Sequence, residues 1–372
     1  MKKYTTYKFR LYPNKTQEAF FKMNFKCVRD IYDLIVQNME WYYMTTGNRL
    51  FSKISYYREK YPYMQEADSS ALNYVNMKLK GKWEDFLHGR SDDYPHPGPH
   101  DHYNDSYTTQ AVENINITEG KVRLPKIGYV RIKQHREIPK GYRLKEVTVK
   151  RQKDGKYFAC MVYEYENNVP AVKPQNIIGL DHSLMKLYVD SNGDTPEFEH
   201  YRHQLNDKIE RERQKLSKMQ KGSRNYTKQW IKIAGLYQKA SDRRINALHK
   251  ISKALADKYD AVCIEDLDIK AMLEQNGCLG KLVLDNGWSM FTVFLQYKLE
   301  EQGKQLIKVD RHFPSSQICS HCGKQNHAMR NYDFKNGPYI KEWDCPYCGA
   351  HHDRDVNAAI NIRNEGMRIM SV

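Results

Sequence analysis

Two pairs of cysteines near the carboxyl end constrain the fold of this chain more than any other feature. Cys319 and Cys322 form one CxxC pair, Cys345 and Cys348 form the other, and a glycine follows each pair. Two such knuckle turns bring four thiolates to the corners of a tetrahedron around Zn²⁺. Because four sulfur ligands leave no open coordination position, we expect a zinc ion that holds the fold together and performs no chemistry. A redox dithiol is the alternative, but two separate pairs at this spacing argue against it.

The rest of the composition predicts a soluble, unexported chain of two or three domains with a polyanionic partner. With 372 residues, 40% of them hydrophobic, the chain is long enough to bury more than one core. No stretch approaches the ~18 to 20 consecutive apolar residues of a membrane span, so we expect no membrane contact. The net charge of +15 makes nucleic acid the first partner to consider. The other four cysteines are expected to be core residues in a reducing cytosol: Cys27, Cys160, Cys263 and Cys278.

Basic residues concentrate in two segments. Residues 121–160 hold 13 basic and 3 acidic side chains, and residues 201–250 hold 14 basic and 4 acidic ones, while the rest of the chain is net acidic. A single basic run is as often a solvated helix face as a binding surface. Two such runs in an otherwise acidic chain favour a charged channel for a phosphate backbone.

The first half of the chain reads as a small basic β-structure interrupted by helices. Residues 7–12 alternate as a half-buried strand does, and two helical patterns follow, through 21–35 and 72–86. Three prolines within 95–99 exclude helix and inner strand, which sets a boundary there. Beyond it, four short strands are predicted, at 122–124, 129–133, 147–151 and 157–165. If the opening strand joins them, the helices are an insertion into a small barrel.

The second half alternates strands and helices. Apolar runs predict strands at 176–181, 184–190, 259–265 and 305–309, with a further candidate near 197–201. A long helical stretch is broken at 221–223, and its second half is amphipathic and basic. Another helix is predicted at 288–301.

Three carboxylates stand where a metal-dependent nuclease would need them. Asp181 and Glu265 each end an apolar strand, and Asp355 opens a helix rich in alanine and isoleucine. Hard oxygen ligands on rigid elements suit Mg²⁺, and two such ions about 4 Å apart activate water and stabilise the leaving oxygen in phosphodiester hydrolysis. The alternative is that each is a surface or capping acid, and Asp355 in particular can be a helix N-cap or first-turn acid.

Five blocks of sequence resemble those of the transposon-encoded TnpB family, in the same order and across nearly the whole chain. The last two blocks are the most specific. The blocks are Tyr7-Lys8-Phe9-Arg10-Leu11-Tyr12-Pro13, Ile178-Gly179-Leu180-Asp181, Ile264-Glu265-Asp266-Leu267, Pro314-Ser315-Ser316-Gln317-Ile318-Cys319-Ser320-His321-Cys322-Gly323 and Asp353-Arg354-Asp355-Val356-Asn357-Ala358-Ala359-Ile360-Asn361-Ile362. The resemblance implies that Asp181, Glu265 and Asp355 form a triad that holds Mg²⁺ or Mn²⁺, and that the four paired cysteines bind Zn²⁺.

The resemblance also implies a multidomain α+β and α/β fold. Its parts would be a wedge β-barrel (1–14 and 103–170), a helical recognition lobe (15–102), a ribonuclease H-like (RuvC) nuclease domain (171–310 and 351–372) and a zinc ribbon (311–350). The implied function is cleavage of double-stranded DNA, directed by a guide RNA and placed next to a short flanking motif that the protein reads. The compartment would be the bacterial or archaeal cytoplasm.

Two other functions stay open. One is a protein-only transposase or resolvase of ribonuclease H-like fold, which would need no RNA; a defined RNA that co-purifies with the protein would argue against it. The other is an RNA-guided DNA-binding repressor without nuclease activity, although all three acids are present. The choice between a transposon-encoded nuclease and a very small CRISPR effector, and the oligomeric state, are also left open, since no sustained heptad pattern is evident.

Overall fold

The computed structural model describes residues 2–48, 50, 52–97, 105–269, 286–331 and 340–371. The chain divides into two compact units, Met1–Asn167 and Asn168–Val372. None of the helices in the described ranges combines the length and the apolar character that a membrane span requires.

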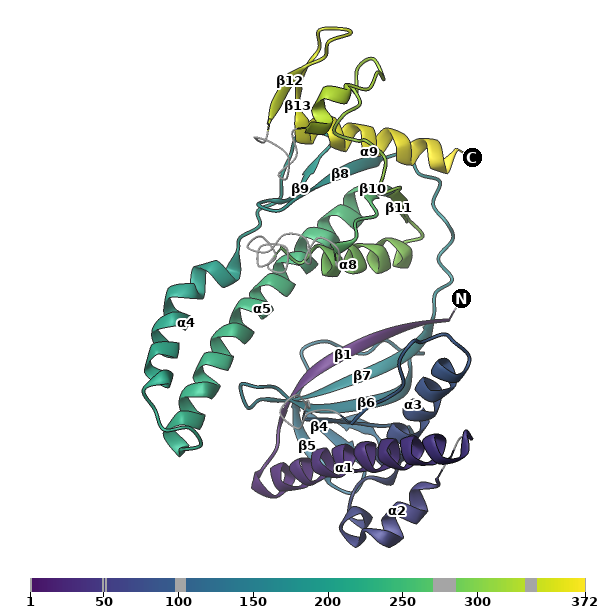
Figure 1. The fold of residues 1–372 in the computed structure, drawn as a ribbon, viewed down its shortest axis with the longest axis vertical. Coiled ribbons are helices and arrows are strands. Elements are labelled where there is room, and N and C mark those ends of the chain that lie inside the picture. Colours follow the sequence, from purple (N-terminus) through teal and green to yellow (C-terminus); the bar gives the residue numbers. More distant parts are fainter. Residues whose placement is uncertain are drawn as a thin grey trace. The chain divides into compact units, whose positions relative to one another are not determined.

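The amino-terminal unit is built on a curled sheet of seven antiparallel strands (Figure 1). The strand order is β2-β6-β7-β1-β5-β4-β3. The bounds are β1 (Lys2–Tyr12), β2 (Ser106–Thr109), β3 (Asn116–Thr118), β4 (Lys121–Leu124), β5 (Gly128–Lys133), β6 (Arg143–Arg151) and β7 (Tyr157–Glu166). The expectation that the opening strand joins the later ones is confirmed, because β1 pairs with both β7 and β5. Within the described residues the edge strands β2 and β3 do not pair with each other, so by its hydrogen bonds the sheet is open.

Among the described residues, three α-helices lie between β1 and β2 in the chain: α1 (Lys15–Thr46), α2 (Ile54–Lys60) and α3 (Ser69–Leu87). The described part of this unit also includes two short 3₁₀ turns, η1 (Pro62–Gln65) and η3 (Val112–Asn114). Asn14 begins α1 through a capping box with Gln17, which satisfies two otherwise unpaired N–H groups. Phe21 and Phe25 of α1 pack on the apolar inner face of the sheet, and a second apolar cluster joins the three helices to one another.

The carboxy-terminal unit has a four-stranded sheet in the order β11-β10-β8-β9. Strands β8, β10 and β11 are parallel, and β9 runs antiparallel to β8. The bounds are β8 (Ile177–Ser183), β9 (Leu187–Asp190), α4 (Tyr201–Ser217), α5 (Arg224–Lys258), β10 (Ala261–Glu265), α8 (Trp288–Glu301), β11 (Gln305–Val309), η5 (His327–Asn331), β12 (Glu342–Asp344), β13 (His351–Asp353) and α9 (Arg354–Met370). The central strand β10 is a nearly uniform apolar run because helices cover both of its faces, whereas the edge strand β11 exposes Gln305 and Lys308.

Helices α5 and α8 cover one face of this sheet and α9 covers the other (Figure 1). The approach of α9 is unusually close. A Cβ on Gly179 of β8 would lie 2.7 Å from the backbone nitrogen of Arg363 and closer still to the carbonyl oxygen of Ala359. A Cβ on Gly366 of α9 would lie 2.8 Å from the Cβ of Cys263 in β10. Glycine at these two positions therefore allows the helix backbone to lie directly on the strands.

Two sequence-based expectations need comment. The strand predicted near 197–201 is wrong: residues 194–200 have no regular structure and α4 begins at Tyr201. The alternating pattern there reflects Phe198 packing against the core, without a neighbouring strand to pair with. Of the single cysteines, Cys27 and Cys263 are buried as expected, Cys160 is half-buried, and Cys278 lies outside the described residues.

Candidate functional site

Asp181 and Glu265 lie side by side just beyond the point where the pairing of two adjacent parallel strands ends, and β8 itself continues to Ser183. The last paired residues of β8 and β10 are Leu180 and Ile264, and each acid is the next residue along its strand. Side chains alternate between the faces of a strand, so Asp181 points to the same face as Gly179, and Glu265 to the same face as Cys263. That is the face that α9 covers, as the close approaches of α9 to these two residues show.

Asp355 reaches this face from α9. It lies in the first turn of the helix, and the N-cap is Asp353, whose Oδ1 accepts hydrogen bonds from the N–H groups of Asp355 and Val356 at 3.0 and 3.1 Å. The capping function that the sequence left open for Asp355 therefore belongs to Asp353. All three predicted acids are half-buried on one face of one sheet.

The electrostatics of Asp181 reflect this convergence. Burial raises the pKa of Asp181 well above its usual range, and the negative charges of Glu265 and Asp355 raise it further. The positive charge of Arg354 opposes these effects. Burial also raises the pKa of Glu265, against a hydrogen bond from Ser315. A site of this kind favours either a bound proton or a bound cation.

Two acids that follow Glu265 in the chain have basic partners, unlike Asp181 and Glu265. Asp266 forms an ion pair with Lys308 at 2.9 Å, and Asp268 forms one with Arg311 at 3.5 Å. Among the described residues, neither Asp181 nor Glu265 has a basic nitrogen within 4.0 Å. Carboxylate oxygens in this setting suit Mg²⁺ or Mn²⁺.

The oxygens of the three acids are not drawn into one tight cluster. Within the described part of the chain, the group of potential ligands whose atoms all lie within 4.8 Å of one another is the four cysteines. The acids thus lie close enough to affect one another's charge without sharing such a compact centre.

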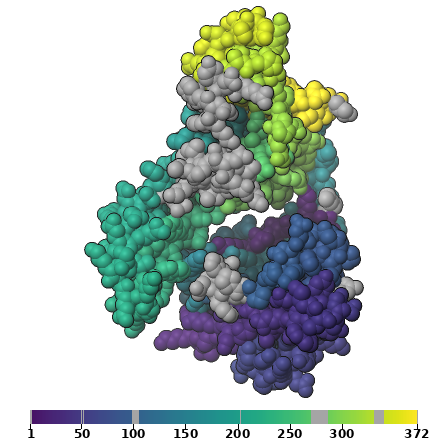
Figure 2. All heavy atoms as spheres, viewed as in Figure 1, coloured from purple at the N-terminus to yellow at the C-terminus, as the bar shows by residue number. Residues whose placement is uncertain are grey.

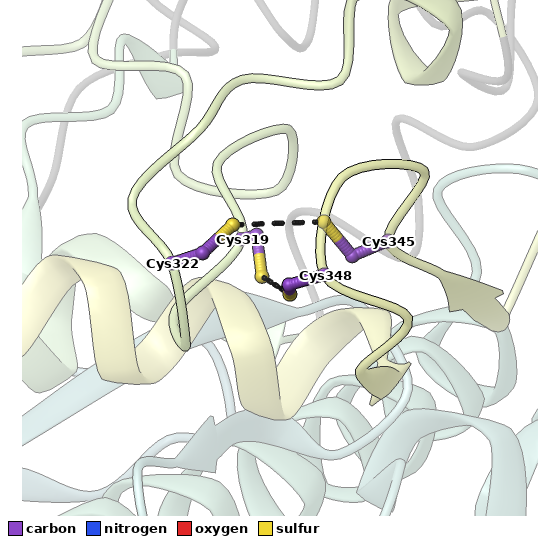
Figure 3. A group of neighbouring side chains, drawn as sticks. All are labelled: Cys319, Cys322, Cys345 and Cys348. Atoms are coloured by element: carbon purple, nitrogen blue, oxygen red, sulfur yellow. Dashed lines mark hydrogen bonds between the residues drawn. The ribbon is translucent and has the colours of Figure 1, made fainter.

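The four paired cysteines converge on one point (Figure 3). The Sγ atoms of Cys319 and Cys348 are 3.7 Å apart, as are those of Cys322 and Cys345. A tetrahedral Zn²⁺ site with Zn–S bonds of about 2.3 Å has sulfur-to-sulfur edges of about 3.8 Å. The donor set and its dimensions therefore fit zinc.

Both halves of this cluster have the same local structure. The N–H of Gly323 donates to the carbonyl of Cys319 at 2.8 Å, and the N–H of Gly349 donates to that of Cys345 at 2.9 Å. Each glycine has a positive φ, 74° and 71°, which a residue with a side chain rarely adopts. His352 adds a contact that the sequence did not suggest, with Nε2 3.0 Å from the Sγ of Cys319.

Two asparagines of α9 tie the cysteine cluster to the carboxylate face. Asn357 donates to the carbonyl of Ile318 at 2.7 Å and accepts from the N–H of Ser320 at 2.9 Å. Asn361 donates to the carbonyls of Ser315 and Ile318 at 2.8 and 2.6 Å. Sequence reasoning gave these residues no role. The available signal was two amides at i and i+4 within an apolar helix, a pattern that indicates buried hydrogen bonds.

The outer face of the amino-terminal sheet alternates basic and aromatic side chains. Pairing places Arg10 beside Lys133 and beside Phe158, and Tyr12 beside Arg131. We call this surface the basic face; its members are Lys8, Arg10, Tyr12, Lys121, Arg123, Tyr129, Arg131, Lys133, Lys150 and Phe158. The Lys8 ammonium lies 4.4 Å from the Phe158 ring centre, and the Arg131 guanidinium 5.7 Å from that of Tyr12. Cations interleaved with aromatic rings suit a phosphate backbone and stacked bases.

The second basic segment forms a helical hairpin, α4 and α5, that extends away from its sheet (Figures 1 and 2). Part of its charge is neutralised within the hairpin. Glu212 is buried, and its carboxylate accepts hydrogen bonds from Lys232 at 2.8 Å, Gln229 at 2.7 Å and Lys215 at 3.1 Å. These bonds lower the pKa of Glu212 to about 2. Lys215 and Lys232 are therefore paired with Glu212, and the count of basic side chains in this segment overstates how many are available to a partner.

Three family models match the chain. A model described as "Probable transposase" matches residues 160–276, a "Cas12f1-like, TNB domain" model matches residues 288–362, and a "Helix-turn-helix domain" model matches residues 1–47. The structure gives the last segment as strand β1 followed by the single long helix α1.

Similar proteins span most of the chain. One, from Streptomyces pristinaespiralis, carries the name "Putative RNA-guided DNA endonuclease"; it is 30% identical over 97% of this chain and 89% of its own length. A second, InsQ of Escherichia coli (strain K12), carries the same description and is 26% identical over 72% of this chain and 67% of its own length. Among solved structures, the Cas12f1 chain of a Cas12f1-sgRNA-target DNA complex matches 95% of this chain and 83% of its own length, with a TM-score of 0.62. Its sequence identity is 15%, so it is evidence for the fold alone. Coverage and identity together show that the chain belongs to the TnpB family.

Proposed function

We propose that this protein is an RNA-guided endonuclease that cleaves double-stranded DNA with Asp181, Glu265 and Asp355 as metal ligands. The observation that carries the proposal is the convergence of three carboxylates on the α9 face of one sheet, where two of them have no basic partner within 4.0 Å among the described residues. The names of the similar proteins supply the guide and the DNA target.

The metal ligands have separate supports. Asp181 and Glu265 are held by the strand ends and Asp355 by the first turn of α9. Mg²⁺ or Mn²⁺ bound there would polarise the scissile phosphodiester and lower the pKa of the attacking water. Arg354 brings a positive charge near Asp181, which limits the repulsion between the carboxylates and an incoming phosphate.

The metal at the cysteine cluster has a structural role in this proposal. Cys319, Cys322, Cys345 and Cys348 hold Zn²⁺ in a closed shell, so the ion does not touch substrate. Its effect reaches the carboxylates through Asn357 and Asn361, which fix the first knuckle to α9. We assign residues 311–350 to a zinc ribbon inserted into a RuvC-like domain of residues 171–310 and 351–372.

The basic face is the surface that we assign to guide RNA. It belongs to the proposed wedge, residues 1–14 and 103–170, from which the helical recognition lobe of residues 15–102 branches. Backbone phosphates would meet its lysines and arginines, and unpaired bases would stack on Tyr12, Tyr129 or Phe158. No base-reading role is assigned here, because in guided systems pairing with the guide reads the target sequence.

The test compares three single alanine substitutions at Asp181, Glu265 and Asp355 with a matched control. Each should abolish DNA cleavage and leave guided DNA binding intact, because guide pairing and backbone contacts lie outside the metal site. Asp266→Ala is the control, since it removes an acid next to Glu265 that is paired with Lys308. Wild-type cleavage should disappear in EDTA and return with Mg²⁺ alone. Near-normal cleavage by one of the three variants would remove that residue from the site, and cleavage in EDTA would remove the metal mechanism.

The same preparations separate the alternatives. A protein-only transposase or resolvase would cleave DNA without a co-purifying RNA. A repressor would bind guided targets and leave them uncut in Mg²⁺. Sequencing of the bound RNA, together with the cleavage assay, therefore distinguishes all three.

A further inference from the structure

One hydroxyl group contacts a proposed metal ligand directly. Ser315 is 5% exposed and lies four residues before the first ligand cysteine. Its Oγ donates a hydrogen bond of 2.5 Å to Oε1 of Glu265. Because Glu265 has no basic partner within 4.0 Å among the described residues, this hydroxyl is a principal constraint on the orientation of its carboxylate.

The position of Ser315 is itself fixed by α9. The side-chain amide of Asn361 donates to the Ser315 carbonyl at 2.8 Å and to the Ile318 carbonyl at 2.6 Å, and Asn361 is 5% exposed. Asn361 is on the helix that carries Asp355, in the same apolar stretch. The buried amide of Asn361 thus links α9, which carries Asp355, to the loop of Ser315, which orients Glu265.

We propose that Ser315 is a positioning residue that presents Glu265 to the catalytic metal, and that Asn361 holds Ser315 in place for this task. The inference rests on the proposed function. The hydroxyl donates to Oε1 and fixes the plane of the carboxylate, so the remaining lone pairs of Glu265 would be held in one orientation toward a cation. Partners that orient metal ligands in this way typically change metal affinity by 10- to 100-fold when removed.

A structural explanation competes with this one. A buried hydroxyl needs a hydrogen-bond partner in any case, and Glu265 supplies an acceptor. That explanation predicts that loss of the hydroxyl changes stability and leaves the metal affinity of the folded protein unchanged. Metal binding, measured without nucleic acid, therefore separates the two.

The experiment measures Mn²⁺ binding to the zinc-loaded, full-length protein by electron paramagnetic resonance. Ser315→Ala should weaken Mn²⁺ binding about 10-fold or more and raise the Mg²⁺ concentration for half-maximal cleavage by a similar factor. Ser315→Thr, which keeps the hydroxyl, should restore both. Ser316→Ala is the matched control, because the adjacent serine is half-buried and, among the described residues, it is Ser315 and not Ser316 that donates a hydrogen bond to Glu265. Zinc content should stay the same in all variants.

The role of Asn361 is tested by a double-mutant cycle. Asn361→Ala should weaken Mn²⁺ binding in the wild-type background and have little further effect when Ser315 is already alanine. Equal Mn²⁺ affinities for wild type, Ser315→Ala and Ser315→Thr, with intact zinc, would overturn the proposal. Glu265→Gln distinguishes this failure from that of the proposed function: if it too binds Mn²⁺ as wild type does, Glu265 is not a ligand at all.

Discussion

Glycine at position 366 sets how closely α9 packs on β10, and its replacement by alanine should destabilise the carboxy-terminal unit. An added Cβ would lie 2.8 Å from the Cβ of Cys263 and closer still to its Sγ. Cys263 is fully buried in an apolar cluster with Val309 and Ile362, so its side chain has little room to move away. Atoms of this kind are in favourable contact at about 3.5 to 4.0 Å, so helix and strand would have to separate by roughly 1 Å.

Two effects of opposite sign determine how much Gly366→Ala changes the free energy of unfolding. Alanine is a better helix former than glycine by about 1 kcal/mol, which favours the variant. Overpacking of a well-packed core typically costs about 1 to 3 kcal/mol, and because this contact involves backbone-attached atoms on both sides, we take the upper part of that range, about 2 to 3 kcal/mol. We therefore expect Gly366→Ala to lower the free energy of unfolding of this unit by about 1 to 2 kcal/mol. Because Asp355 is on the same helix, we also expect slower DNA cleavage.

Gly81→Ala is the matched control. Gly81 is exposed in the interior of α3, and an added Cβ would meet nothing within 4 Å. The same substitution should there stabilise the amino-terminal unit by about 0.5 to 1 kcal/mol. Hydrogen exchange in increasing urea, followed on peptides from α9 and α3, reports the free energy of each region separately. If both substitutions changed stability in the same direction, the argument from close packing would be refuted.

Three further outcomes are expected. Cys319→Ser should lower the zinc content and, through the contacts of Asn357 and Asn361 to the first knuckle, the cleavage rate; full activity without bound zinc would contradict this coupling. Asp181→Asn should be more stable than wild type at pH 7, measured with zinc present and no added Mg²⁺. Because the pKa of Asp181 is raised in the folded state, the wild-type protein loses stability as the pH rises above the unfolded pKa of about 3.9. The free energies of unfolding of the two proteins should therefore converge below about pH 4, and a difference that does not change with pH would argue against this reasoning. Replacing Arg131 and Lys133 of the basic face with glutamine should weaken binding to RNAs of unrelated sequence alike and flatten the salt dependence, and an unchanged salt slope would show that this face is merely solvated.

Sequence patterns identified the elements whose boundaries are set locally. The helix predicted at 288–301 and the strand predicted at 305–309 have these bounds in the structure. Gly287 precedes this helix and Gly303 follows it, and both have a positive φ, which helps to set the ends of the helix. The strand predicted near 197–201 failed because alternation also arises where a single aromatic residue packs on a core, and pairing depends on a neighbouring strand that the local sequence does not encode.

The candidate site was only partly accessible from the sequence. The ends of apolar runs indicated Asp181 and Glu265, and parallel pairing in the structure places them next to each other. Ser315 was visible only as part of a sequence block, because its role depends on a hydrogen bond across 50 residues of chain. Likewise, the internal neutralisation of Glu212 by Lys215 and Lys232 is a property of hairpin packing that a charge count cannot contain.

The close packing of α9 and the raised pKa of Asp181 have a common origin. Gly179 and Gly366 let the helix lie directly on the strands, and this brings Asp355 to the face where Asp181 and Glu265 point. Three acids on one half-buried face repel one another and lose hydration, which destabilises the folded chain when all are ionised. If these acids hold a metal ion, as we propose, its binding would offset this cost, whereas in its absence protonation of Asp181 offsets it. Gly179 and Gly366, which allow the close packing of α9, would then also contribute to the affinity of this face for a cation.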